Sequence, residues 1–119
     1  MAAGPEDILQ MQVMRTLKAL APGLTIFAIP NGGYRHPREA KKLKDTGTLP
    51  GVADLCVLLG GGRAGFIEMK TPTGRMTPEQ KAFQMTCETS GTPYEVCKSV
   101  DDVVATLTFW GVEFQGRLT

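Results

Sequence analysis

Two acidic residues stand in stretches that otherwise read as buried β-strand. Asp54 lies in the apolar run Ala53 to Leu59, and Glu68 lies in a second run, Ala64 to Lys70. A carboxylate buried without a partner is costly, so such residues usually hold a cation or join a hydrogen-bonded network. Glu68 and Lys70 are two residues apart, so along a strand they project from the same face. The sequence therefore predicts that two acids and one base converge at one point.

Two carboxylates and a lysine suit chemistry on phosphodiesters. Mg²⁺ is typically held by one or two carboxylates plus waters, and a hard cation polarises a phosphate and supplies hydroxide at neutral pH. The lysine can stabilise developing negative charge or orient a water. Because neighbouring carboxylates favour the charged form of Lys70, we do not expect it to act as a neutral general base unless something desolvates it. The alternative is a plain cross-strand ion pair, with Asp54 as a turn or cap residue.

A third acid occupies an unusual place near the N-terminus. At about 100° per residue, Glu6 falls in the same helical stripe as Leu9, Val13 and Leu17, where an acid needs a partner. The alternative is a first-turn acid that only favours the helix dipole.

The length and composition predict one folded domain, residues 1–119. A chain of 119 residues with 42% hydrophobic and 21% charged residues can bury a single core and is not compositionally disordered. No apolar run approaches the roughly 20 residues that span a bilayer, and Met1 to Ile8 lacks a signal-peptide pattern. We therefore expect an intracellular protein that is neither secreted nor bound to a membrane.

The cysteines favour neither structural zinc nor disulfides. Cys56, Cys87 and Cys97 are odd in number and widely spaced, and His36 is the only histidine. We expect reduced cysteines packed in the core.

Basic residues gather in one segment, although the formal net charge is only +1. Between Tyr34 and Lys44, Glu39 is the only acid among five basic residues: Arg35, Arg38, Lys41, Lys42 and Lys44. Such a cluster can neutralise phosphates, and a solvated face is the alternative.

The apolar pattern predicts the elements that position these residues. A helix is expected from Pro5 to about Leu20, and a strand from Leu24 to Ile29. The basic segment follows and is expected to be irregular or briefly helical. The two apolar runs around Gly60 to Gly62 should then form a hairpin.

The second half of the chain continues with two capped helices. Thr77 and Gln80 form a predicted capping box for a helix to about Ser90, ended by Gly91. A strand from Tyr94 to Lys98 follows, and Ser99 with Asp102 predicts a second capping box for a helix through about Phe109. The order is α-β-β-β-α-β-α, which predicts an α/β fold with a small mixed sheet flanked by helices.

These residues also carry a family resemblance. The segments 50–55 (PGVADL) and 66–70 (FIEMK) resemble the signature of PD-(D/E)xK nucleases, and more narrowly of the VRR-NUC domain. The likeness covers roughly Glu6 to Leu107 and extends to Pro30-Asn31-Gly32-Gly33, Thr71-Pro72-Thr73-Gly74 and Thr77-Pro78-Glu79-Gln80-Lys81. The resemblance implies a restriction-endonuclease-like α-β-β-β-α-β core and a metal-dependent deoxyribonuclease.

The resemblance also implies roles for individual residues. Asp54, Glu68 and the backbone carbonyl of Met69 would bind Mg²⁺ or Mn²⁺, and Lys70 would position the attacking water. Glu6 matches a first-helix acid beside the metal, and Gln80 matches a position near the active centre without losing its capping role. Two departures are clear: Pro50 and Asp54 are separated by three residues, and the letters VRR are absent near Val96-Cys97-Lys98-Ser99.

For the substrate, the resemblance implies DNA. Stand-alone members of the family resemble Holliday-junction resolvases, so we expect a homodimer that cuts four-way junctions and leaves 5′-phosphate and 3′-hydroxyl ends. Lys81 and Lys98 join the basic segment as expected DNA contacts. Late apolar residues could form the dimer interface or cap the core: Phe109, Trp110, Val112 and Phe114.

Two alternatives to a junction nuclease stay open. One is a flap, nick or duplex-end nuclease on the same fold, and the other is a DNA-binding module that does not cut. Intact Asp54, Glu68 and Lys70 argue against the second. Nothing in the sequence favours a role in RNA processing.

Overall fold

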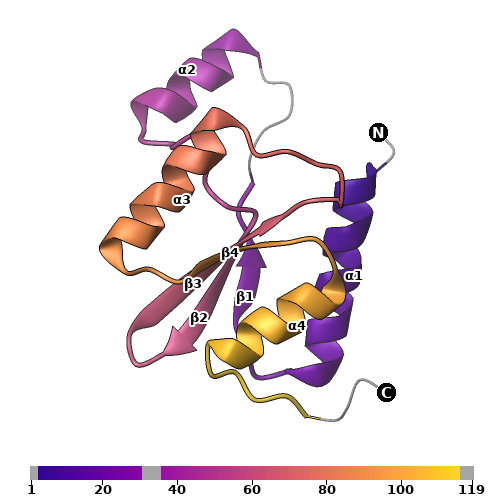
Figure 1. The fold of residues 1–119 in the computed structure, drawn as a ribbon. Coiled ribbons are helices and arrows are strands. Elements are labelled where there is room, and N and C mark those ends of the chain that lie inside the picture. The colour runs from indigo at the N-terminus through magenta and orange to yellow at the C-terminus, as the bar shows by residue number, and fades with distance from the viewer. Residues whose placement is uncertain (1–2, 31–35, 116–119) are drawn as a thin grey trace.

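The computed structural model describes residues 3–30 and 36–115, which form both helices and strands. Within those ranges the elements are α1 (Pro5–Leu20), β1 (Ile26–Ala28), α2 (Pro37–Asp45), β2 (Leu55–Gly60), β3 (Arg63–Met69), α3 (Pro78–Ser90), β4 (Tyr94–Cys97) and α4 (Val100–Phe109). The α/β class predicted from the sequence is confirmed (Figure 1).

The four strands form one mixed sheet in the order β1-β2-β3-β4. β2 pairs with both β1 and β3 in antiparallel fashion, and β3 pairs with β4 in parallel. The glycine turn between β2 and β3 makes the expected hairpin. A parallel pair needs a crossover, and α3 provides it between β3 and β4.

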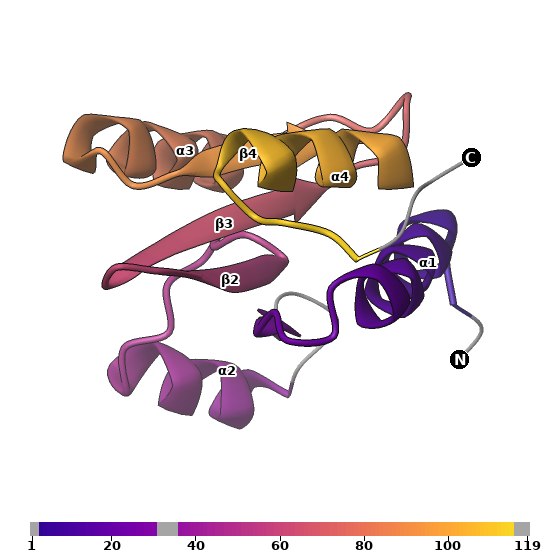
Figure 2. The same ribbon diagram turned by 90° about the horizontal axis from the view of Figure 1, so that it is seen from below.

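Helices cover both faces of the sheet (Figure 2). On one face, alternate residues of β2 and β3 pack against α1 and α4 in the main core, whose members include Val13, Leu17, Leu55, Val57, Ile67, Met69, Val103 and Leu107. On the other face, Phe66 meets Phe83 of α3 edge to face, and Phe83 in turn meets Tyr94. Because side chains alternate along a strand, Glu68 lies on the same face as Phe66.

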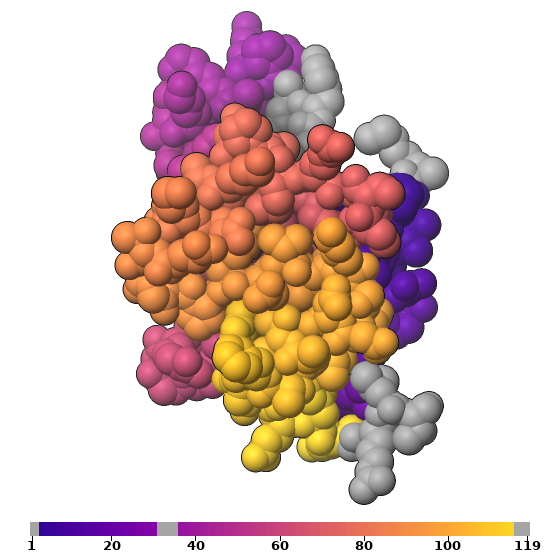
Figure 3. Space-filling view, in the orientation of Figure 1, coloured from indigo at the N-terminus to yellow at the C-terminus, as the bar shows by residue number. Residues whose placement is uncertain are grey.

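Of the two structures expected for the basic segment, irregular or briefly helical, the second is found: its residues from Pro37 onward form the nine-residue helix α2. Local features are sufficient to start it: Pro37 occupies the first turn, and the His36 side chain accepts a hydrogen bond from the Arg38 N–H. No residue of α2 is buried. In the space-filling view the helix stands out from the upper end of the molecule (Figure 3).

Strand boundaries also differ by a few residues from those predicted. β1 is shorter, β2 begins only after Asp54, and β3 ends at Met69, just before Lys70. Asp54 and Lys70 therefore stand just outside the ends of their strands.

The predicted caps are confirmed with one difference. Thr77 and Gln80 form both bonds of a capping box. At α4 the Ser99 side chain accepts from the Asp102 N–H, but the Asp102 carboxylate accepts from the N–H of Lys98 and so completes no reciprocal box with Ser99.

The late apolar residues divide between the core and the surface. Trp110, Val112 and Phe114 pack against the core, whereas the Phe109 side chain is 88% exposed. The three cysteines are buried and unpaired, as expected. In the part of the chain that the structure describes, no helix is long and apolar enough to cross a bilayer.

Candidate active site

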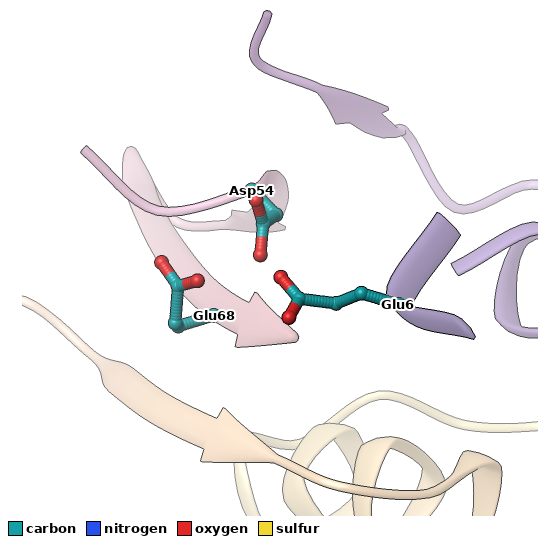
Figure 4. A group of neighbouring side chains, drawn as sticks. All are labelled: Glu6, Asp54 and Glu68. Carbon is teal, nitrogen blue, oxygen red and sulfur yellow. The ribbon is translucent and has the colours of Figure 1, made fainter. Parts of the chain in front are cut away.

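Three carboxylates from distant parts of the sequence meet at one end of the sheet. Glu6 comes from the first turn of α1, Asp54 from the bend before β2, and Glu68 from β3 (Figure 4). One carboxylate oxygen of each lies within 4.8 Å of the others. The structure therefore brings together the two acids singled out in the strands and the acid singled out in the first helix.

Asp54 is fixed by the backbone on both sides of it. Its Oδ2 accepts a hydrogen bond of 2.8 Å from the Met69 N–H, and its carbonyl accepts one of 2.7 Å from the Ile29 N–H. These bonds tie the bend to the ends of β1 and β3. Asp54 is thus positioned next to the segment that holds Glu68, Met69 and Lys70.

Glu68 is almost fully buried, with 1% of its surface exposed. Its Oε2 lies 3.4 Å from the Gln80 Nε2 and 3.8 Å from the Lys70 Nζ, while its Oε1 is buried with no hydrogen-bond partner among the described residues. Burial raises the pKa of Glu68 to about 9, Asp54 adds to the shift, and Lys70 opposes it. Without a cation, this carboxylate therefore favours its protonated form.

Lys70 is also buried, with 6% of its surface exposed. Its N–H donates to the carbonyl of Cys97, so the backbone stays attached to β4 beyond the last residue of β3. The Nζ contact with Glu68 joins a residue of β3 to the residue just beyond the end of the same strand, and so it does not connect two strands. Asp54 and Glu6 lie at the same place. The arrangement is therefore more than the isolated cross-strand ion pair that was the alternative interpretation of the sequence.

Gln80 contacts both the cap of α3 and the acidic cluster. Its Oε1 accepts a hydrogen bond from the Thr77 N–H at 2.9 Å, and its Nε2 points to Glu68. The side chain that caps α3 therefore also connects the start of this helix to the acidic cluster.

Glu6 is half-buried beside these residues. Burial raises its pKa, the charge of Lys70 lowers it, and Asp54 and Asp7 raise it again. A first-turn acid that served only the helix dipole would have no reason to face two other carboxylates.

Gly51 is a positioning residue to which the sequence analysis assigned no role. Its φ is +86°, and a Cβ at this position would collide with the backbone of Glu79 and lie 2.8 Å from the Gln80 nitrogen. The absence of a side chain lets the loop before Asp54 pack directly on the first turn of α3. The Pro50-Gly51 pair signals a turn, but nothing in the sequence says what the turn packs against.

The donor set fits a divalent cation. All three groups offer oxygen ligands, which hard cations such as Mg²⁺ and Mn²⁺ prefer. Three acids at this separation repel one another unless a cation or shared protons neutralise them. A cation would also give the buried Oε1 of Glu68 the partner that it lacks.

The expected DNA contacts are exposed but spread over several elements. Arg38, Lys41, Lys42 and Lys44 lie on α2, Lys81 on α3 and Lys98 just after β4. Lys41 already contacts Asp45, with 2.6 Å between the Nζ and Oδ2. Figure 1 shows α2 at the same end of the molecule as the N-termini of α1 and α3. Arg35 lies outside the described residues.

The fold and the acidic cluster together define a nuclease-type domain. The sequence model of the VRR-NUC domain matches residues 6–101, and the chain belongs to this family. It is similar to a solved structure described as a VRR_NUC domain protein, with a TM-score of 0.70 and 23% identity, over 93% of this chain and 91% of the other. Family membership and the cluster indicate that the domain uses a divalent metal.

A second solved structure, described as a VRR_NUC domain, is similar with a TM-score of 0.60 and 21% identity, over 87% of this chain and 97% of the other. At these identities the two likenesses show the fold. The search of curated proteins gives no match.

Proposed function

We propose that the protein is a metal-dependent, structure-specific DNA endonuclease. The observation that carries the proposal is the convergence of Glu6, Asp54 and Glu68 with the buried Lys70 at one end of the sheet. A non-cleaving DNA-binding module would have no use for three mutually repelling carboxylates beside a buried lysine.

Each residue of the cluster receives a role in this proposal. Asp54 and Glu68 hold the metal, with the Met69 carbonyl and Glu6 as further ligands. Bound Mg²⁺ or Mn²⁺ would polarise the scissile phosphate and lower the pKa of a coordinated water. Lys70 orients the attacking water and stabilises negative charge on the phosphate oxygens. Gln80 positions the Glu68 carboxylate through its side-chain amide.

The substrate in this proposal is branched DNA, with a four-way junction as the first choice and a homodimer as the acting form. Phosphates would be bound by the basic residues of α2 together with Arg35, Lys81 and Lys98. A symmetric dimer presents two active sites to the two equivalent strands of a junction. Because such DNA is found inside cells, we propose an intracellular location.

Cleavage assays with several DNA structures test the proposal directly. Labelled four-way junction, flap and linear duplex would each be incubated with Mg²⁺, Mn²⁺ or EDTA, using wild type, Glu68→Gln and Lys70→Ala. We expect cutting of the junction with either metal, none in EDTA, and a loss of at least roughly 100-fold in both variants. Absence of metal-dependent cleavage of every substrate would exclude the enzyme, and equal cutting of linear duplex would exclude junction specificity.

The same assay distinguishes a junction nuclease from a nuclease of the same fold that has another substrate. Preferred cutting of the flap or of duplex ends would identify a flap, nick or duplex-end nuclease. The catalytic roles of Asp54, Glu68 and Lys70 would then stand, and only the substrate would change.

A further inference from the structure

The outer side of α1 carries an apolar strip that no described residue covers. Ile8 and Met11 are 46% and 49% exposed, and half-buried Met14 lies one turn further along. A hollow along this side is lined by Asp7, Gln10, Met11, Met14 and Arg15. A second hollow begins at Met14 and Arg15 and continues to Leu24 and Ile26 beside the sheet. Exposed apolar side chains such as Ile8 and Met11 beside adjoining hollows are typical of a surface that binds another protein.

Two charges of opposite sign frame this strip. Asp7 and Arg15 stand four residues before and four residues after Met11, so all three share one stripe of the helix. Neither Asp7 nor Arg15 forms an ion pair within the described ranges 3–30 and 36–115. The strip therefore has an acidic end, an apolar centre and a basic end.

This polarity makes the strip complementary to itself. When two copies of α1 pack antiparallel about a two-fold axis at Met11, each Asp7 faces the partner's Arg15, and Met11 meets the partner's Met11. A parallel arrangement would place like charges together. An isologous interface needs this kind of self-complementary surface.

We propose that the outer side of α1, centred on Met11 and framed by Asp7 and Arg15, is the interface of a two-fold symmetric homodimer. The inference deepens the proposed function by assigning the dimer to this surface instead of the late apolar residues, most of which cap the core. Glu6 points to the opposite side of the same helix, into the acidic cluster. The paired α1 helices would therefore set the spacing and orientation of the two active sites.

Charge reversal tests the interface by sedimentation in the absence of DNA and metal. Wild type should be dimeric. Asp7→Arg and Arg15→Asp each place two like-charged pairs across the axis, and each should weaken the dimer at least about tenfold, because both symmetric pairs change sign. An equimolar mixture of the two variants should form a heterodimer, and the double variant Asp7→Arg/Arg15→Asp should regain the dimer. Glu88→Arg on α3 changes the charge equally and should leave the dimer intact.

A second variant covers the case in which Asp7→Arg folds poorly, since an acid is favoured in the first turn. Met11→Glu keeps the helix and brings two carboxylates together at the axis, so it too should give monomers with an unchanged circular dichroism spectrum. A monomeric wild type, or a dimer insensitive to Met11→Glu and to both reversals, would overturn the interface. Because sedimentation does not depend on cleavage, an inactive protein that shows the charge-swap pattern would refute only the proposed function.

Discussion

At the scale of single residues, the acidic cluster stores unfavourable electrostatic energy when no metal is bound. Glu68 is buried, and its pKa is raised from the ordinary value of 4.5 to about 9. At a pH between these two values, Glu68 is protonated in the native state and ionised in the unfolded state. The free energy of unfolding of the metal-free protein therefore falls as pH rises through this window.

Glu68→Gln should remove this pH dependence. In EDTA, the native state of the wild type binds one more proton than its unfolded state. Its free energy of unfolding should therefore fall by about 1.4 kcal/mol for each unit by which the pH rises. Urea unfolding at pH 5, 6, 7 and 8 measures the slope. The slope of Glu68→Gln should be smaller by most of this amount, and equal slopes in both proteins would show that Glu68 is ionised throughout.

Glu6→Gln tests whether the first-helix acid belongs to the metal site. Removing one of three repelling carboxylates should leave the metal-free protein at least as stable as wild type. Its affinity for Mn²⁺ should fall roughly 10- to 100-fold, as for other groups that hold a metal site together. Calorimetric titration with Mn²⁺ measures this without DNA. An unchanged affinity would return Glu6 to the role of a helix-dipole acid.

At the scale of elements, the contact between the loop before β2 and the first turn of α3 holds the site together. Gly51→Ala should push these segments apart, because its Cβ has no space beside the backbone of Glu79 and its φ is positive. We expect a loss of about 1 to 3 kcal/mol in unfolding free energy, together with a loss of cleavage as Asp54 and Gln80 separate. Chemical denaturation and the junction assay measure the two effects.

Gly47→Ala is the matched control for that variant. Gly47 has a φ of +100°, but nothing lies within 4 Å of a Cβ built on it. The Gly47→Ala variant should lose only the unfolding free energy that a positive φ costs an alanine, and it should keep its cleavage activity. Equal losses of activity in both variants would contradict a specific role for the approach of Gly51 to α3.

The helix α2 should contribute to DNA affinity in a salt-dependent way. Lys42→Ala combined with Lys44→Ala, in the inactive Glu68→Gln background, should reduce the slope of log Kd against log salt by about 2, because two phosphate contacts are lost. Fluorescence anisotropy over a salt series measures it. Arg63→Ala, at the first residue of β3 after the hairpin turn, should leave the slope unchanged.

Sequence periodicity and capping were sufficient to predict most elements, because α1, the hairpin and α3 are encoded by local patterns. The acids were found because each interrupts an apolar run or stripe. Other features depend on contacts that no local pattern contains. The packing of Gly51 on α3 is one, and the bond from the Lys98 N–H to Asp102 in place of a full capping box is another. The sequence also left open whether the basic segment is irregular or briefly helical, since a helix without buried residues has no apolar periodicity.

At the scale of the whole molecule, a homodimer formed through α1 would carry two active sites. These two sites would act on two strands of a four-way junction. Each subunit would then cut one strand. The charge variants of α1 offer a way to build dimers of defined composition, because Asp7→Arg and Arg15→Asp pair with each other and not with themselves.

A mixed dimer with one inactive subunit should therefore stop after one cut. Asp7→Arg would be mixed with Arg15→Asp that also carries Glu68→Gln, and the substrate would be a supercoiled plasmid with an extruded cruciform. We expect nicked circles to accumulate, whereas the mixed dimer with two active subunits should give linear plasmid, because paired cuts separate the junction within one encounter. Rapid formation of linear plasmid by the half-active dimer would show that a single subunit cuts both strands, and that the symmetry of the dimer is not what matches the enzyme to its substrate.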